Sequence, residues 1–334
     1  MNIGLIGAGL IGKQRLFCLS NSALVTKIYI LEPNLQTVKS ITESEFIDPQ
    51  KIAFCSGVNE FQLNEIDRYI LSGNHEVNYE YIKLLIPLGR KILIEKPMGR
   101  NLEEAKIISS LELFDKQICV GFNYRFMPGV QKILEEVADG ELGEIISIKL
   151  TLGHGGSPND NDSWKLDEDI AGGGALLDPG VHLIDFLVNS LNFLGDLVFN
   201  DINIWRGFWK TGIEESVFAL GTLGNAQVFM ESSIVLWRTE FSIEIVGTKG
   251  YSKINGRGRS DGPQIHTSGK RWAWVEGHKS QIESEIHQTV MEKDFSLEKE
   301  TLSWLSDDYL LCDSKQSLKV MQQVSVLYKI MNSK

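Results

Sequence analysis

The sequence predicts an α/β chain in which a doubly wound parallel sheet is followed by an α+β domain with a large, mostly antiparallel sheet. Up to about residue 121, short β-branched segments alternate with helical ones, the pattern of a parallel sheet covered on both faces. Strand-like segments separated by glycine turns dominate the second half. The 334 residues also exceed one typical core. We therefore expect domains at 1–121 and 122–334, with the C-terminal helix able to pack back on the first domain.

The first domain is expected to alternate strands with helices. The expected strands are Asn2–Ile6, Lys27–Leu31, Arg68–Leu71, Lys91–Ile94 and Gln117–Val120. The expected helices are Leu10–Ser20, Glu76–Leu88 and Asn101–Leu113.

The second domain is expected to open with a helix and to continue mainly as strands. The expected helices are Pro128–Ala138, Val181–Asn189 and a final one with an apolar stripe at Val320, Val324, Leu327 and Met331. The expected strands are Glu144–Leu152, Ser216–Thr222, Ala226–Leu236, Phe241–Val246 and Ser252–Ile254, and the polar, glycine-rich segment Gly153–Gly174 is expected to be a loop.

The composition argues against several classes of partner. A net charge of -11 opposes binding to nucleic acid and to anionic membranes. The apolar runs are far shorter than the ~20 residues of a membrane span, and the first strand begins almost at Met1, as expected without a signal peptide. The cysteines lack the spacing of a metal or redox pair, so we expect free thiols, no metal site and a cytoplasmic protein. They are Cys18, Cys55, Cys119 and Cys312.

A glycine motif, GxGxxG, lies between the first strand and the first helix. Gly7 permits the turn, Gly9 lets a pyrophosphate approach the backbone, and Gly12 lets the helix pack on the sheet. Glu32 ends the second strand, 20 residues after Gly12, where a carboxylate accepts both ribose hydroxyls and repels a 2′-phosphate. These features predict a Rossmann domain that binds NAD, with NADP disfavoured. The alternative for Glu32 is a solvated acid at a strand end.

Two further segments carry groups suited to chemistry. Glu95 and Lys96 end a strand, at the edge where doubly wound sheets bind ligands, although a surface salt bridge is the alternative. Asp178 and His182 are four residues apart, so on a helix the carboxylate could orient the imidazole. The alternative is that Asp178 caps a helix with Pro179 at its first position, and that His182 is structural.

Taken together, these segments make the sequence resemble the Gfo/Idh/MocA family, named for glucose–fructose oxidoreductase and inositol dehydrogenase. The resemblance covers the chain from its start to about residue 186. The segments that carry it are GLIGAGLIG at 4–12, EKPMG at 95–99, GFNYRFMPGVQKI at 121–133, ELGEI at 141–145 and GGGALLDPGVHLIDF at 172–186.

The resemblance implies roles for individual residues. Lys96 matches a lysine that contacts nicotinamide and substrate, and the Lys96–Pro97 bond matches one that is often cis. His182 matches an acid–base histidine and Asp178 its carboxylate partner. Ser72-Gly73-Asn74 replaces the Thr-Pro-Asn usual in the family, which leaves the contacts on the nicotinamide side open.

The expected site residues fall into three groups. Catalysis is assigned to Lys96, Asp178 and His182. The cofactor is assigned to Gly7, Gly9, Leu10, Ile11, Gly12, Glu32, Ser72, Asn74, Glu95 and Lys96. The substrate is assigned to Lys96, Tyr124, Arg125, His154, Trp164, Asp178, His182 and Arg271.

Two local features extend the substrate group. His154 and Trp164 belong to a polar loop that ends in an aromatic residue, which suits a sugar. Arg271 belongs to a basic–aromatic cluster, Lys270–Trp274, that could bind a phosphate and stack a base. The alternative for this cluster is an exposed loop or a subunit contact.

The expected function is therefore hydride transfer between a sugar or nucleotide-sugar hydroxyl carbon and NAD. His182 would take the hydroxyl proton, and Lys96 would stabilise the alkoxide. An NAD-using glycosidase or sugar–sugar oxidoreductase on the same scaffold is one alternative, and a non-catalytic NAD-binding sensor is another. The resemblance further implies a homodimer or homotetramer built on the large sheet.

Overall fold

In the computed structural model the chain divides into two compact units, which we call the first and the second unit. The structure describes residues 1–63, 65–156, 163–271, 286–308 and 310–333. The first unit comprises Met1–Asn123, Ile170–Gly172 and Ser296–Met321. The second comprises Tyr124–Asp169, Gly173–Phe295 and Gln322–Lys334. Beyond the contiguous boundary expected at 121, a late segment of the chain therefore returns to the first unit.

The first unit contains a seven-stranded sheet in the order β15-β6-β5-β4-β1-β2-β3. Apart from β15, which pairs antiparallel with β6, these strands are parallel, and their order is that of a doubly wound dinucleotide-binding fold. The strands are β1 (Asn2–Ile6), β2 (Lys27–Leu31), β3 (Ile52–Phe54), β4 (Arg68–Leu71), β5 (Lys91–Glu95), β6 (Ile118–Gly121) and β15 (Cys312–Asp313). The expected parallel sheet is confirmed.

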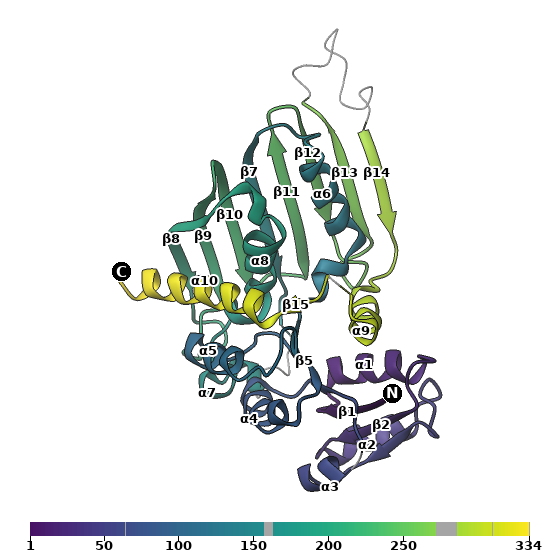
Figure 1. Ribbon diagram of the computed structural model, residues 1–334. Helices are drawn as coiled ribbons and strands as arrows, with labels where there is room; N and C mark the ends of the chain where they lie inside the picture. The colour runs from purple at the N-terminus through teal and green to yellow at the C-terminus, as the bar shows by residue number, and fades with distance from the viewer. Residues whose placement is uncertain (64, 157–162, 272–285, 309, 334) are drawn as a thin grey trace. The chain divides into compact units, whose positions relative to one another are not determined.

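The helices of the first unit follow its strands in the chain, as Figure 1 shows. They are α1 (Leu10–Ser20), α2 (Leu35–Thr42), α3 (Val58–Leu63), α4 (His75–Leu85), α5 (Leu102–Ser110), α9 (Ser296–Ser306) and the start of α10 (Ser314–Asn332). The short helix α7 (Glu168–Ala171) lies across the boundary between the units. Sequence reasoning did not predict α2, β3, α3, α9 or β15, which are short or carry no strong apolar period.

The second unit contains an eight-stranded sheet in the order β14-β13-β12-β11-β7-β10-β9-β8. Only β7 and β10 run parallel, so the expected large, mostly antiparallel sheet is confirmed. The strands are β7 (Ile145–Gly153), β8 (Leu197–Trp205), β9 (Ser216–Leu223), β10 (Ala226–Ser233), β11 (Glu240–Gly247), β12 (Gly250–Asn255), β13 (Gln264–Lys270) and β14 (Ile286–Met291).

One face of this sheet forms the core of the second unit. Alternate residues of the central strands, such as Ile148, Leu150, Ile243 and Ile245, are almost fully buried. Figure 1 shows α6 (Pro128–Ala138) and α8 (Val181–Asp185) lying over one face of the sheet. Burying this one face supplies most of the apolar contact that holds sheet and helices together.

All four cysteines are buried free thiols in the first unit. Burial raises the pKa of Cys18 to about 11 and that of Cys119 to about 12. These thiols therefore stay protonated at neutral pH. Among the described residues, no helix is both long enough and apolar enough to cross a lipid bilayer.

Candidate active site

The glycine motif forms a backbone cradle at the carboxyl end of β1. Gly7 has φ +80°, and a Cβ there would lie 2.6 Å from the backbone nitrogen of Gly73. A Cβ at Gly12 would overlap the carbonyl oxygen of Gly7. At Gly9, by contrast, a Cβ would meet nothing within 4 Å. Gly7 and Gly12 thus serve the fold, whereas the space beside Gly9 is open to a ligand.

Helix α1 begins in this cradle with its amino end available for an anion. Its N-cap, Gly9, has no side chain, and its first turn contains no acidic residue. The N–H groups of Leu10, Ile11 and Gly12 belong to the turn that has no intrahelical acceptors. Leu10 is 78% exposed beside them. This donor set fits a pyrophosphate.

Glu32 follows β2 and lies against the glycine turn. Its carboxylate accepts hydrogen bonds from the backbone N–H of Ala8, at 2.7 Å, and of Asn34, at 2.9 Å. It is therefore oriented by the backbone instead of being a freely solvated acid. A carboxylate fixed beside the cradle fits the ribose hydroxyls of an adenosine.

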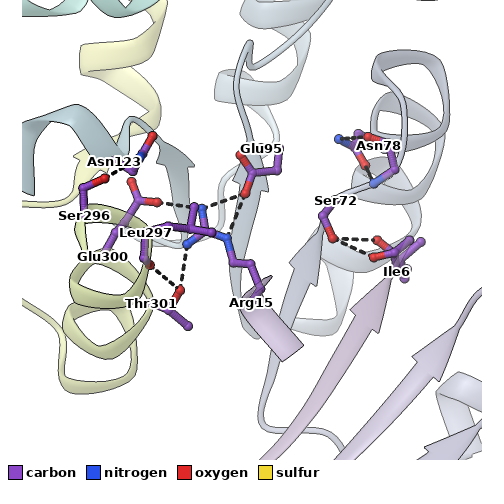
Figure 2. Close-up of polar contacts among 12 residues, drawn as sticks. Ile6, Arg15, Ser72, Asn78, Glu95, Asn123, Ser296, Leu297, Glu300 and Thr301 are labelled. Carbon is purple, nitrogen blue, oxygen red and sulfur yellow. Dashed lines mark hydrogen bonds and ion pairs between the residues drawn. The ribbon is translucent and has the colours of Figure 1, made fainter. Parts of the chain in front are cut away.

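Ser72-Gly73-Asn74 follows β4 and contacts the glycine turn on its other side. The Ser72 hydroxyl donates to the carbonyl of Gly7 at 2.7 Å. It also lies 3.4 Å from the carbonyl oxygen of Ile6, a contact drawn in Figure 2. Asn78 binds both the N–H and the carbonyl of Gly73. Asn74 caps α4 by accepting from the N–H of Val77 at 2.8 Å. Here the clamp from Asn78 holds a turn where the family usually has a proline.

Lys96 follows β5 directly, and its bond to Pro97 is cis, as the resemblance implied. The preceding residue, Glu95, accepts a hydrogen bond at 2.8 Å from Nε of Arg15 on α1 (Figure 2). Glu95 was expected to contact the cofactor, whereas its carboxylate in the structure forms an ion pair inside the first unit.

In the second unit, Asp178 and His182 belong to one continuous helical stretch, Leu176–Ser190, in which α8 is flanked by π turns. Helical structure therefore begins before Asp178, which rules out Asp178 as its N-cap. The Asp178 carboxylate accepts from Nζ of Lys165 at 2.8 Å. His182 is only 7% exposed.

Tyr124 lies flat on the imidazole of His182, with ring centroids 4.1 Å apart and planes 11° from parallel. Both rings line a pocket. Its remaining lining residues are Arg125, Val130, Leu183, Asp185, Phe186, Ser190, Phe241 and Ile243. The Tyr124 hydroxyl accepts from Arg257 at 2.9 Å. Burial lowers the pKa of Arg257, but the contacts with Tyr124 and Asp261 raise it by more. The net pKa is raised, so this guanidinium is charged.

Arg125 contacts the helix that carries His182. Its Nε and one terminal nitrogen donate to the two carboxylate oxygens of Asp185, at 2.8 and 2.7 Å. Both side chains are almost fully buried. Such a bidentate pair fixes the helix at a point one turn beyond His182.

The remaining expected substrate residues lie at two ends of the sheet. His154 follows β7 at the end where β11 begins, because Gly153 pairs with Glu240 and Leu152 with Phe241. Trp164 lies in a 3₁₀ turn together with Lys165, and the ammonium group of Lys165 binds the carboxylate of Asp178. Residues 157–162 of the same loop lie outside the described residues.

Arg271 lies at the opposite end of β11 from the pocket. Its guanidinium donates to the carbonyl of Gly247 at 3.1 Å, six residues beyond Phe241. At ~3.3 Å per residue this is about 20 Å along the strand. Within one chain the structure therefore does not bring Arg271 to His182. Trp272 and Trp274 of the same cluster lie outside the described residues.

Buried Glu214 holds the glycine segment that leads into the His182 helix. Its Oε1 accepts from the N–H of Gly174 and of Leu176, both at 3.0 Å, and from the Tyr328 hydroxyl at 2.9 Å. Side chains at Gly173 and Gly174 would overlap Tyr328 and the Glu214 backbone. Burial raises the pKa of Glu214, although these donors lower it.

Sequence reasoning missed Arg15, Arg257 and Glu214, whose partners lie far along the chain. A weak signal existed for two of them. Arg15 interrupts the apolar side of the first helix, and Arg257 lies in the glycine-rich segment Gly256–Gly262. Neither pattern names a partner, so only the fold could assign one.

Two family models match the chain, one for each half. The model described as an oxidoreductase family, NAD-binding Rossmann fold, matches residues 1–122. The GFO/IDH/MocA C-terminal domain matches residues 130–253.

Two curated relatives are sugar dehydrogenases by name. The levoglucosan dehydrogenase of Pseudarthrobacter phenanthrenivorans is 30% identical over 197 residues, 55% of this chain, and the match spans half of that relative's length. The D-glucoside 3-dehydrogenase of Escherichia coli is 23% identical over 268 residues, which are 73% of this chain and 71% of the relative.

Two solved structures have the same fold. A levoglucosan dehydrogenase in complex with NADH and levoglucosan aligns with a TM-score of 0.79 at 18% identity, over 100% of this chain and 97% of the other. A 3-ketoreductase from Actinomadura kijaniata, in complex with NADP and TDP-benzene, aligns with a TM-score of 0.78 at 18% identity, over 98% and 97%. Because the two matching models describe the Rossmann and C-terminal domains of one family, in chain order, the chain belongs to the Gfo/Idh/MocA oxidoreductases.

Proposed function

We propose that this chain is an NAD-dependent dehydrogenase that oxidises a secondary hydroxyl of a sugar or nucleotide sugar. The observation that carries the proposal is His182, which lines a pocket under the Tyr124 ring in the second unit. The relatives' names support a sugar substrate. The nucleotide-linked ligand of the 3-ketoreductase supports the wider class.

In the proposed reaction, cofactor binding is assigned to residues of the first unit and proton transfer to residues of the second. Bound NAD would supply the hydride acceptor, and the Gly9 cradle would hold its pyrophosphate while Glu32 would hold its adenosine ribose. His182 takes the proton of the sugar hydroxyl as general base. Lys96 stabilises the negative charge that develops on that oxygen. Asp178, one helical turn before His182, is paired with Lys165 of the 3₁₀ turn Trp164–Leu166, and its carboxylate biases the imidazole electrostatically.

Some expected contacts receive different roles in this proposal. Arg125 is bound bidentately by Asp185, so we assign it to holding the His182 helix and not to the sugar. Arg271 is left out of the catalytic pocket because it lies at the far end of β11. His154 and Trp164 remain candidates for the sugar.

We propose NAD over NADP because the Glu32 carboxylate is fixed beside the glycine turn. A negative charge there opposes a 2′-phosphate. Calorimetric titration with NADH and NADPH tests this directly. Tighter binding of NADPH, or equal preference in wild type and Glu32→Ala, would contradict it.

The reaction itself is tested by a screen of polyols, sugars and nucleotide sugars, with NADH formation read by fluorescence. The D-glucoside 3-dehydrogenase and 3-ketoreductase names make position 3 the first carbon to test, with substrate deuterated there. Net NADH from a single sugar supports the dehydrogenase. Bond cleavage without net NADH would favour a glycosidase, and binding without any turnover would favour a sensor.

We also propose that the chain forms a homodimer or homotetramer through the outer face of its large sheet. Val198, Phe218, Leu220 and Phe229 are 43–52% exposed there, and Phe229 pairs directly with Leu220. Such a grouping of apolar side chains is typical of an interface. Light scattering should give a multiple of 37.5 kDa, and Phe229→Glu should shift it toward the monomer. A monomeric wild type would contradict the proposal.

A further inference from the structure

Arg15 is a fully buried arginine whose three guanidinium nitrogens bind three different side chains. Nε donates to Glu95 at 2.8 Å, and the terminal nitrogens donate to Thr301 at 2.9 Å and to Glu300 at 2.6 Å (Figure 2). Glu95 lies 80 residues away in the chain, and the other two lie more than 280 away. The fork thus joins α1, β5 and α9 inside the first unit.

This network is too costly to be incidental. A buried guanidinium loses its hydration, and only pairing and hydrogen bonding compensate for that loss. Burial lowers the pKa of Arg15, but Glu95 and Glu300 raise it more, so the charge is retained. The planar fork of arginine fixes all three partners in direction, which a lysine could not do.

The network ends one residue from Lys96. Glu95 pairs across the sheet with Gly121 of β6. A Cβ at Gly121 would lie 2.8 Å from Oε2 of Glu95 and 3.0 Å from the Arg15 guanidinium. The carboxylate therefore fills the space that a side chain would occupy, which restricts the end of β5 on that side.

Helix α9 contacts the neighbouring strand end as well. The Ser296 hydroxyl accepts from Nδ2 of Asn123 at 2.7 Å, and Asn123 follows β6. Ser296 and Glu300 are four residues apart, so one face of α9 reaches both positions. Carboxyl ends of parallel strands are where doubly wound sheets bind ligands.

We propose that Arg15, fixed by Glu300 and Thr301 of α9, is a positioning residue that sets the place of Lys96 at the end of β5. The proposal rests on the role assigned to Lys96 in the proposed function. It means that a helix contributed by residues 296–306 determines the geometry of a lysine that precedes it by 200 residues.

The opposite end of α9 supplies a matched control. There Asp307 binds Arg68 at 2.8 Å and Lys91 at 2.6 Å, at the starts of β4 and β5. Asp307→Asn removes one charge from these ion pairs and so loosens the attachment of α9 at the start of β5, the end of that strand opposite Glu95. Asparagine also tolerates the φ of +63° at this position.

The test compares Arg15→Lys with Asp307→Asn. Arg15→Lys keeps the charge and loses the fork, so kcat should fall roughly 10- to 100-fold while the KM for NAD stays within about twofold. The primary deuterium isotope effect should rise as hydride transfer becomes rate-limiting. Asp307→Asn should lower Tm comparably but leave kcat per folded molecule unchanged. If both variants reduce kcat only in proportion to unfolding, the positioning role is wrong.

A second measurement needs neither sugar nor cofactor. The rate at which acetic anhydride labels Lys96, read by peptide mass spectrometry, should change severalfold in Arg15→Lys and stay constant in Asp307→Asn. If Arg15→Lys does not fold, the isosteric Glu300→Gln replaces it. The Lys96 labelling rate should then still differ from wild type, although by less than a severalfold change. A Lys96 labelling rate that is unchanged in both Arg15→Lys and Glu300→Gln overturns the proposal. If wild type oxidises no sugar but the labelling result holds, the proposed function fails and the positioning role stands.

Discussion

The proposed cofactor site, here called the cofactor side, is built mainly from backbone, and the proposed substrate site, the substrate side, is built from side chains. On the cofactor side, three glycines, one helix terminus and one carboxylate lie within the first 32 residues. On the substrate side, Tyr124, His182, Phe241 and Arg257 come from segments spread over more than 130 residues. A site made of backbone groups is determined by residues that are neighbours in the sequence. A site made of side chains depends on the fold that brings distant residues together.

The largest expected effect comes from removing one charged or basic group on each side. Lys96→Ala and His182→Ala should each lower kcat by ~100-fold or more, because they remove an electrostatic stabiliser and a general base. Each should fold and bind NADH. Steady-state kinetics beside calorimetry gives both numbers, and a variant with near wild-type kcat would contradict the role assigned to its residue.

The glycines allow a sharper test of the cofactor side. Gly9→Ala should leave Tm unchanged and weaken NADH binding about tenfold or more, since its Cβ enters open space intended for the pyrophosphate. Gly57→Ala is a matched control, because its Cβ also meets nothing within 4 Å. Gly12→Ala should lower Tm instead. Normal NADH affinity in Gly9→Ala would show that the cradle has been misread.

A smaller effect is expected from the Tyr124 hydroxyl on the substrate side. Tyr124→Phe keeps the stack on His182 but removes the acceptor for Arg257, which retains Asp261. Because the bond from Arg257 fixes the Tyr124 ring in the proposed sugar pocket, its loss should raise the KM for sugar, by up to roughly tenfold, with NADH affinity unchanged. Tyr251→Phe in β12 is the control. Equal KM values in the two variants would remove Tyr124 from the substrate side.

These tests also indicate how far the sequence could lead. The glycine motif, Glu32 and the strands around them could be predicted because each depends on neighbours in the chain. Position at a strand end and spacing on a helix marked Lys96 and His182 as candidates, but their specific roles came only from the resemblance, since a lone lysine or histidine has no diagnostic pattern. Arg15 and Arg257 could not be found, because the physical reason for a buried arginine is its remote carboxylate or hydroxyl partner.

Arg125 illustrates a different limit. Its segment, GFNYRF, marks the right region of the chain, but sequence cannot say whether a guanidinium there binds substrate or protein. The fold brings Asp185 within 2.7 Å and thereby assigns it a protein partner.

The smallest expected effect concerns Glu214, whose carboxylate binds the backbone N–H groups of Gly174 and Leu176 at the start of the His182 helix. Because burial raises its pKa, the folded state binds its proton more tightly than the unfolded state. Stability should therefore fall as pH rises from about 4.5 through the folded-state pKa, and then stay level. Glu214→Gln does not titrate, and its Oε1 can keep all three donors. Its stability relative to wild type should increase over that pH range in urea unfolding, whereas a constant difference would contradict the assignment.

The placement of the cysteines makes the first unit observable on its own. All four thiols are buried there, and the second unit has none. An alkylating reagent in native buffer therefore reacts only when the first unit opens locally or globally. The alkylation rate therefore reports the opening of the first unit alone, because the rest of the chain has no thiol to react. A dinucleotide that binds only the closed form should lower the alkylation rate in proportion to the fraction of protein that is occupied. The rate then measures dinucleotide affinity without any catalytic turnover.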